Sequence, residues 1–260
     1  MVTSRPTGEQ RTDERDYSVR AVERVCAILN LLQESIDGVS LIEIAEATEL
    51  PKSSAFRYLW TLEAYRYVER DAEAGMYRLG LGFVGMQSRQ VEVLRQRARP
   101  VLERLRDEFG ETVNLGVLDG DSAIYLEIVE SRRSVRLAAK RGDRDPLHAT
   151  ALGKAIAAYL PEERVRELLV ASGMPARTVN TITSPTDYLT ELATVRRVGH
   201  ALDNGENEVD GRCVAVVIPG TRLPAALSLS APAARLPMQD IAKVATALRA
   251  AAEQIAATPG

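Results

Sequence analysis

The sequence predicts an α+β protein in two parts, and three observations indicate it. Residues 18–80 contain closely spaced helical patterns, followed by two short alternating segments around a glycine-containing loop. From Gly110 onward the apolar pattern changes to a period of two. Period-two segments then stand before and after a group of helical segments, without strict strand–helix alternation. This order favours a second domain built on an antiparallel sheet.

Composition narrows the class of protein. The chain has 260 residues, of which 45% are hydrophobic. It is therefore long enough, and apolar enough, to form two domains that each have a hydrophobic core. No apolar run approaches the roughly 20 residues that span a bilayer, and the N-terminus does not resemble a secretory signal. Cys26 and Cys213 stand far apart, which argues against a disulfide scaffold or a zinc site. We therefore expect a cytoplasmic protein without a membrane partner, metal or cofactor.

The chain begins with a polar segment and one amphipathic helix. Residues 1–17 are predicted to be a disordered arm. A helix is expected from Ser18, with its apolar stripe at helical spacing. Cys26 lies on this stripe and is predicted to be a small buried residue. The stripe consists of Val22, Val25, Cys26, Leu29 and Leu32.

Residues 40–64 predict two short helices around a tight turn. Ser40 is a suitable N-cap for the first, with Glu43 as its capping-box partner, and Pro51 suits the first position of the second. No carboxylate occurs between Leu50 and Thr61. The outer face of the second helix is instead cationic and hydroxyl-bearing, which is typical of a helix-turn-helix that enters the DNA major groove. It carries Lys52, Ser53, Ser54, Phe56 and Arg57. An ordinary αα-hairpin within a protein-interaction module is the alternative.

The segments 65–70 and 76–79 predict a β-hairpin, and a helix-turn-helix followed directly by a hairpin is a winged helix. Arg70 and Arg78, with Arg66 beside them, are placed to contact phosphates from the wing. Residues 1–80 nevertheless hold ten Lys and Arg against fourteen Asp and Glu, which speaks against strong DNA binding by a monomer. We therefore expect a dimer or a higher oligomer.

The remaining chain is divided at residues 81–97, a linker helix, and 98–260, the second domain. Pro100 is expected to start a fresh helix that ends near Phe109. The strands expected in the second domain are Thr112–Leu118, Ala123–Val129, Val135–Ala139, Gly199–Asp203, Cys213–Ile218 and Ala225–Ser230. Its expected helices are 149–160, 161–171, 185–198 and 238–257.

Seven short motifs, in this order and at these intervals, give the chain a family resemblance. They are Arg20–Arg24, Leu50–Ser54 with Arg57, Tyr77–Gly80, Leu147–Ala155, Gly199–Asp203 with Glu206, Arg212–Ala215 and Ala226–Ser230. Over residues 18–257 the sequence resembles the IclR family of bacterial transcriptional regulators. One departure is Glu49, which occupies a turn position that favours glycine because φ is positive there.

The resemblance implies an N-terminal winged helix-turn-helix, a linker helix and a GAF-like effector domain. It implies a ligand-responsive regulator of catabolic genes that binds operator DNA as a homodimer or homotetramer, with a small organic acid as effector. It places an anion site at the backbone N–H groups of Ala151 and Leu152. By the same resemblance, ligand-facing positions are Asp203, Cys213, Ser228 and Ser230. Packing of the cysteine and serines against the sheet is the alternative.

The rival prediction is a hydrolase-like enzyme that uses Cys213 as nucleophile. The chain contains two histidines, His148 and His200, but no GxSxG, Walker or HExxH motif. We therefore expect no catalytic residues and favour the regulator.

Overall fold

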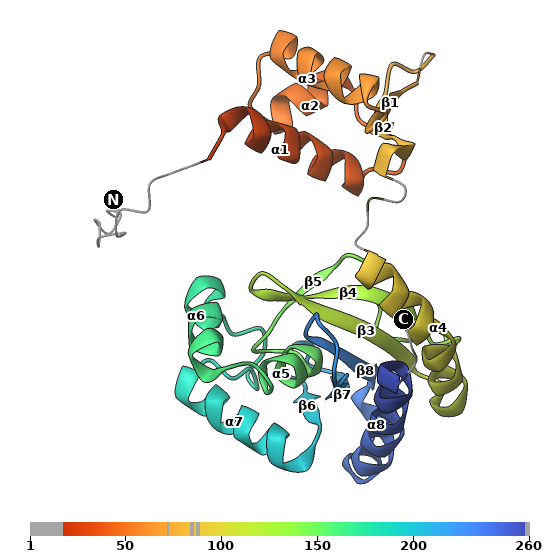
Figure 1. Cartoon of the computed structure of the whole chain (residues 1–260), viewed down its shortest axis with the longest axis vertical. Helices are drawn as coiled ribbons and strands as arrows, with labels where there is room; N and C mark the ends of the chain where they lie inside the picture. The colour runs from red at the N-terminus through yellow and green to blue at the C-terminus, as the bar shows by residue number, and fades with distance from the viewer. Residues whose placement is uncertain (1–17, 72, 84–85, 87–88, 258–260) are drawn as a thin grey trace. The chain divides into compact units, whose positions relative to one another are not determined.

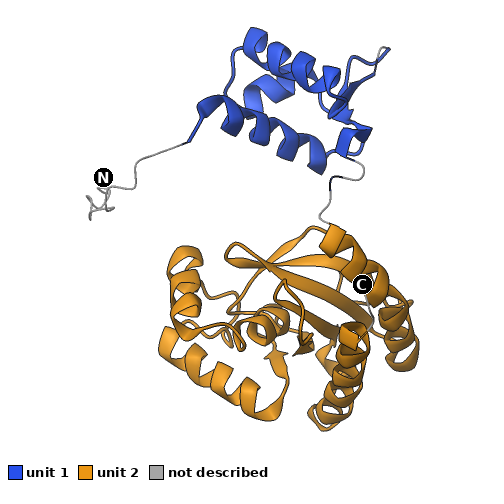
Figure 2. Cartoon of the chain, viewed as in Figure 1, with its two compact units in different colours: residues 1–87 blue, residues 88–260 orange. Residues whose placement is uncertain are grey.

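The computed structural model describes residues 18–71, 73–83, 86 and 89–257. The chain separates into two compact units, residues 1–87 and 88–260 (Figure 2). The N-terminal arm expected at residues 1–17 lies outside the described residues. No helix in the described ranges combines the length and hydropathy that crossing a membrane requires.

Unit 1 has the predicted winged helix-turn-helix fold (Figure 1). Its elements are α1 (Arg20–Glu34), α2 (Leu41–Ala47), α3 (Lys52–Ala64), β1 (Val68–Arg70), β2 (Tyr77–Leu79) and the 3₁₀ turn η1 (Leu81–Phe83). The strands β1 and β2 pair antiparallel to form the wing. The predicted capping box is present, because Ser40 Oγ accepts from the Glu43 N–H and Glu43 accepts from the Ser40 N–H.

Two details of unit 1 differ from the sequence prediction. Cys26 is exposed, because the face of α1 that packs on the core presents Ile28 and Leu32, and the stripe is rotated relative to the prediction. Pro51 is the N-cap of α3 rather than its first helical residue, with an extended ψ of 136°. The core of this unit joins all three helices to the wing through residues such as Ile44, Leu59 and Tyr77.

Unit 2 is built on the expected antiparallel sheet, in the order β5-β4-β3-β8-β7-β6. The strands are β3 (Thr112–Asp119), β4 (Ser122–Val129), β5 (Arg144–Pro146), β6 (Ala201–Asn204), β7 (Gly211–Val217) and β8 (Ala225–Pro232). The helices are α4 (Arg89–Phe109), α5 (Ala151–Ala157), α6 (Glu162–Ser172), α7 (Pro185–Val198) and α8 (Ile241–Ala257), with 3₁₀ turns η2 (Ala233–Arg235) and η3 (Met238–Asp240).

Different helices pack on the two faces of this sheet. α4 and α8 pack on one face and enclose the larger core (Figure 1). α5 packs on the other face, with α6 and α7 outside it. α5 approaches closely because the strands beneath it carry small residues, including Gly116, Ala215 and Ala226. Near the other end of that face the strands carry polar side chains instead, and the residues that line a cavity there belong to strands and loops.

Two expectations about unit 2 are wrong. Val135–Ala139 is not a strand; the edge strand is Arg144–Pro146, which was not among the expected strands. The helix expected to end at Arg97 instead continues through Pro100 to Phe109 as part of α4. Pro100 is exposed on α4, so the backbone carbonyl that loses its N–H donor there can be solvated by water.

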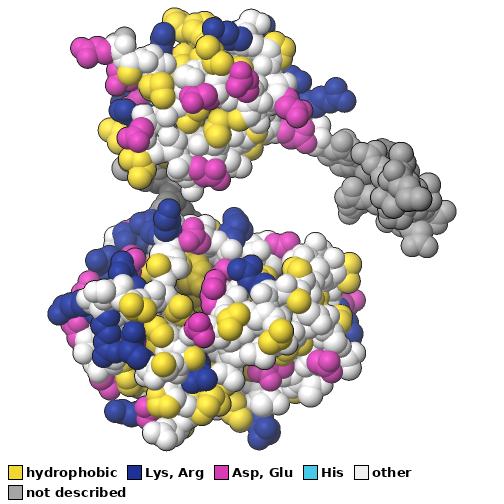
Figure 3. Space-filling view, turned by 180° about the vertical axis from the view of Figure 1, so that it is seen from behind, with side chains coloured by type: hydrophobic (Ala, Val, Ile, Leu, Met, Phe, Trp, Pro, Cys, Tyr) yellow, Lys and Arg dark blue, Asp and Glu magenta, His cyan; other side chains and the backbone are white. Residues whose placement is uncertain are grey.

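The surfaces of the units differ in charge pattern. Lys and Arg side chains gather along one side of unit 2, whereas acidic and hydrophobic side chains are interspersed over unit 1 (Figure 3). Several α4 arginines are paired: Arg95 and Arg99 both contact Glu127, at 2.8 and 3.0 Å. These arginines hold α4 on the sheet, since β4 carries Glu127.

Candidate functional site

The outer face of α3 presents the residues predicted to contact DNA. Lys52, Ser53, Phe56 and Arg57 are exposed, and Ser54 is half-buried. The opposite face is anchored in the core by three buried residues, Ala55, Leu59 and Leu62. α3 is therefore fixed by its apolar face while a cationic face remains open to solvent, as a recognition helix requires.

Both helices of the helix-turn-helix end in the same backbone motif. After α2, the Leu50 N–H bonds the Ala45 carbonyl at 2.9 Å, and Glu49 adopts a φ of 52°. After α3, the Tyr67 N–H bonds the Leu62 carbonyl at 2.9 Å, and Arg66 adopts a φ of 61°. These are Schellman C-caps with a non-glycine residue in the left-handed position. The turn at Glu49 thus keeps its shape and bears backbone strain.

The wing arginines have different environments. Arg70 is exposed, and its guanidinium lies 5.7 Å from the centre of the Tyr77 ring. Arg78 donates twice to the Asp37 carbonyl, at 3.0 and 3.1 Å, and lies 3.9 Å from Asp71. Arg78 therefore ties the wing to the loop before α2, while Arg70 leaves most of its donors open.

A cavity of about 350 Å³ lies against the polar part of the sheet in unit 2. Of the six predicted effector residues, it collects Asp203, Cys213 and Ser230. Asp203 pairs with Cys213 across β6 and β7, and Cys213 pairs with Ser230 across β7 and β8. The cavity is lined by Thr112, Asn114, Tyr125, Arg136, Leu137, Ala138, Ala139, Asp143, Asp145, Arg177, Asp203, Asn207, Glu208, Gly211, Cys213 and Ser230.

The other three predicted residues lie outside this lining. Ala151 and Leu152 are buried in α5, with their side chains in the smaller core. Ser228 is buried and does not line the cavity, but it shares a hydrogen-bond donor with Ser230, which does. Asn114 Nδ2 donates to the hydroxyl oxygens of Ser228 and Ser230, both at 3.1 Å. Asn114 itself was missed by the sequence reasoning, although an amide in the middle of a predicted buried strand was an available signal.

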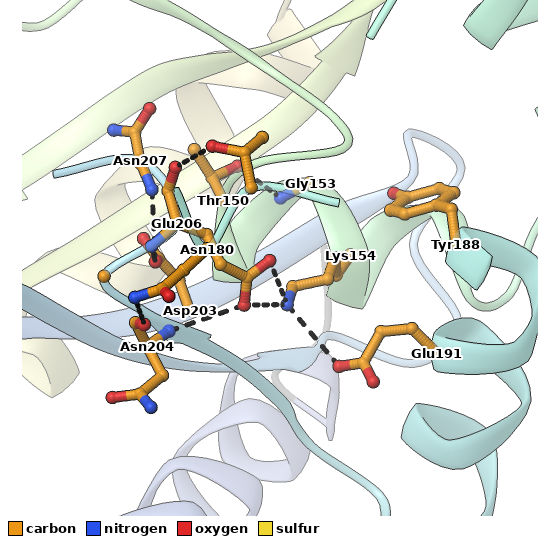
Figure 4. A network of polar contacts seen from close by, with 12 residues as sticks. Thr150, Gly153, Lys154, Asn180, Tyr188, Glu191, Asp203, Asn204, Glu206 and Asn207 are labelled. Carbon is orange, nitrogen blue, oxygen red and sulfur yellow. Dashed lines mark hydrogen bonds and ion pairs between the residues drawn. The ribbon is translucent and has the colours of Figure 1, made fainter. Parts of the chain in front are cut away.

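A buried polar network adjoins the cavity (Figure 4). Lys154 of α5 is almost completely buried and donates to both carboxylate oxygens of Glu206, at 2.7 and 2.9 Å, and to Glu191 at 3.4 Å. Asp203 Oδ1 accepts the N–H groups of Glu206 and Asn207, at 2.7 and 3.3 Å. The network thus fixes the loop after β6, which carries cavity residues.

Burial changes the acid–base behaviour of the cavity groups. It raises the pKa of Asp203 to about 6, and the neighbouring Glu206 carboxylate acts in the same direction. Burial and the Asp203 charge raise the pKa of the Cys213 thiol. Tyr125 donates to Asp145 at 2.8 Å, and burial followed by the Asp145 charge raises its pKa. Cys213 is therefore a protonated thiol at neutral pH, the opposite of an activated nucleophile.

Comparison with known proteins gives the family. Residues 87–257 match a family model described as the bacterial transcriptional regulator IclR C-terminal domain, and residues 21–72 match the IclR helix-turn-helix domain. The chain belongs to the IclR family. Its relatives include the regulator XynR of Escherichia coli K12, at 35% identity over 86% of this chain and 90% of XynR. The acetate operon repressor of Salmonella typhimurium is 33% identical over 91% of this chain and 89% of its own length.

Solved structures of IclR regulators superpose on most of the chain. The Thermotoga maritima IclR structure has a TM-score of 0.74 at 30% identity, covering 91% of this chain and 97% of that one. An IclR homologue from Microbacterium hydrocarbonoxydans, complexed with 4-hydroxybenzoate, has a TM-score of 0.78 at 27% identity, covering 90% and 97%. The protein is thus an IclR-type transcriptional regulator with a helix-turn-helix domain and a C-terminal ligand-binding domain.

Proposed function

We propose that this IclR regulator reads its operator with α3 and the wing, and that a small organic acid bound in the cavity of unit 2 controls that binding. The exposed cationic face of α3 carries the proposal. Lys52, Ser53, Ser54, Phe56 and Arg57 are the α3 residues proposed to contact DNA, with Arg70 and Arg78 reaching phosphates from the wing. Regulation of catabolic genes from the cytoplasm is part of the same proposal.

The cavity supports a role in sensing a metabolite. About 350 Å³ is within the range of small-molecule sites, and side chains with N, O or S atoms converge on it from all six strands of the sheet. Arg177 lines it, is exposed, and makes no ion pair among the described residues, so it can receive a carboxylate. We propose Asp203, Cys213 and Ser230 as contact residues, with Ser228 acting through Asn114. Ala151 and Leu152 remain a proposal that rests on the family resemblance.

The proposal includes a homodimer or homotetramer. Two recognition helices on one face of DNA must address major grooves about 34 Å apart, which a monomer cannot do. Two exposed apolar residues, Val22 of α1 and its N-cap residue Val19, support association of the DNA-binding units. An effector can shift the balance between binding-competent and incompetent arrangements only by its differential affinity for them.

Arg57 is the cation of α3 best suited to contact a base or a phosphate. Arg57→Ala should weaken binding to the DNA upstream of the gene by at least about tenfold, because one bidentate or phosphate contact contributes about 1–3 kcal/mol in each subunit. An electrophoretic shift titration at several salt concentrations measures this. Arg164→Ala is the matched control, since Arg164 is an exposed arginine of α6 in unit 2. Equal affinity of the Arg57 variant and wild type at moderate salt would refute the assignment of α3.

A further inference from the structure

The charge of the cavity does not match a simple organic acid. Acidic side chains outnumber arginines in its lining by four to two. The acids are Asp143, Asp145, Asp203 and Glu208, and the cations are Arg136 and Arg177. Arg136 is already engaged by Glu130, at 2.8 and 3.0 Å. A ligand that brings only negative charge would therefore meet a surplus of carboxylates.

The two inner carboxylates have hydrogen-bond donors but no ion-pair partner among the described residues. Asp145 is half-buried on β5 and accepts the Tyr125 hydroxyl. Asp203 is 3% exposed and accepts two backbone N–H groups. Neither forms an ion pair within the part of the chain that the structure describes, because Lys154 is directed to Glu206 and Glu191. Ionised carboxylates buried in this way are costly unless a positive charge accompanies them.

Asn114 adds a third unused acceptor. Its side chain lines the cavity, and the residue is 2% exposed. Nδ2 is consumed by the two serine hydroxyls, while Oδ1 is buried and finds no donor among the described residues. A buried carbonyl oxygen without a donor is destabilising, so a ligand that supplies N–H groups at this place is favoured.

We propose that the ligand of this cavity carries a cationic nitrogen, ammonium or guanidinium, held by Asp145 and Asp203 with Asn114 Oδ1 as a further acceptor. A carboxylate at its other end would bind Arg177, making the ligand zwitterionic and amino-acid-like. A hydroxyl could satisfy the same acceptors but would leave both carboxylates without an ion-pair partner. This proposal rests on the proposed function, because it names the chemical class of the effector.

The test compares ω-amino acids with ω-hydroxy acids of the same length, and includes agmatine as a cationic probe without a carboxylate. Full-length protein is titrated calorimetrically with 4-aminobutyrate, 5-aminopentanoate, 6-aminohexanoate and agmatine, and with the ω-hydroxy acids of equal chain length. At least one amino compound should bind, and at least about tenfold more tightly than its hydroxy partner, since hydrogen bonds to charged groups are stronger than those between neutral groups. Hydroxy acids that bind as tightly as their amino partners, or a failure of every cationic probe to bind, would overturn the proposal.

Substitutions in the cavity test whether the probes bind there. Asp145→Asn keeps an acceptor for Tyr125 and should weaken the amino compound at least about tenfold, whereas the exposed Asp240→Asn should not. Arg177→Gln, at the exposed rim, should weaken the zwitterions but spare agmatine, which lacks a carboxylate. Unchanged binding by Asp145→Asn contradicts the proposal. Operator titrations with the same probe separate the two claims: a probe bound at Asp145 that leaves DNA affinity unchanged supports this site and contradicts control of DNA binding by it.

Discussion

At the scale of single residues, the cavity is distinguished by Asp203, a carboxyl group whose environment disfavours its charge. Burial is the main cause of its raised pKa, and Glu206 adds to it, while two backbone N–H groups and Lys154 act in the opposite direction. Tyr125, Cys213 and Asp145 are the other titratable groups near it. The folded protein therefore holds a proton at Asp203 that the unfolded chain would release between about pH 4 and 6.

The raised pKa of Asp203 makes the stability of the folded protein depend on pH. Because the folded state binds more protons in that window, the contribution of Asp203 to stability is full below about pH 4 and is lost as the pH rises through about 6. The pKa of Glu206 is also raised by burial, whereas burial lowers the pKa of His200, which opposes the trend.

The Asn variant isolates the contribution of Asp203. The stability of wild type relative to Asp203→Asn should be greater at pH 5 than at pH 7.5 by roughly 1.4 kcal/mol, and the difference between their unfolding temperatures should change accordingly. Calorimetric scans of both proteins across this range measure it. A difference that is flat, or that grows with pH, contradicts the raised pKa. Asp240→Asn, an exposed substitution on η3, should show no such trend.

At the scale of secondary-structure elements, the sequence predicted what local signals determine. α7 was predicted with its observed bounds, because Ser184 caps it, Pro185 begins it and Gly199 ends it. β5 was missed because its three residues become a strand only by pairing with the edge of β4. Val135–Ala139 has strand-like alternation but no strand partner, so alternation alone misled the prediction.

The cavity residues also differ in whether a local sequence signal predicts them. Asp203, Cys213 and Ser230 were predicted from motifs on strands, whereas Tyr125, Asp145 and Arg177 come from three separate segments and carry no local motif. Only the packing of β4, β5 and the loop before α7 brings them to one cavity. A single sequence contains no information on such a convergence unless the tertiary fold is already known.

The end of α2 permits a test of strain within an element. Glu49→Gly should stabilise unit 1 by up to about 1 kcal/mol, since glycine adopts a positive φ without the steric cost that Glu49 bears. Glu46→Gly, three residues earlier and within α2, should destabilise it by a similar amount. Urea unfolding followed by the fluorescence of Trp60 measures both, because Trp60 is the single tryptophan of the chain and lies in α3. Changes of equal sign in the two variants would contradict the strained turn.

At the scale of the whole molecule, each unit has a hydrophobic core of its own. The core of residues 1–87 joins α1, α2 and α3 to the wing, and the two cores of residues 88–260 lie on either side of the sheet. Each unit should therefore fold without the other. The boundary expected at residue 98 does not respect this division, since it cuts α4 near its middle.

The residue at which a fragment of the ligand-binding unit begins determines the stability of that fragment. A fragment of residues 88–260 should unfold cooperatively, because α4 is complete and covers one face of the sheet. A fragment of residues 98–260 lacks Leu94, which is buried, and Arg95, whose guanidinium donates to the nearly buried Glu127. Glu127 keeps Arg99 as a partner, so the loss of Arg95 costs less than the roughly 3–5 kcal/mol of a fully broken buried pair, and the loss of a buried leucine from the core adds roughly 2–5 kcal/mol.

Thermal unfolding followed by circular dichroism compares the two fragments directly. The shorter fragment should melt at least about 10 °C lower, given that 1 kcal/mol shifts the midpoint of a domain of this size by about 2–4 °C. The fragment of residues 88–260 that carries both Leu94→Ala and Arg95→Ala should show most of the decrease in melting temperature seen for the shorter fragment. If the restored helix with both substitutions is as stable as the complete fragment, the stabilisation comes instead from helix length, and the packing of α4 on β4 does not account for it.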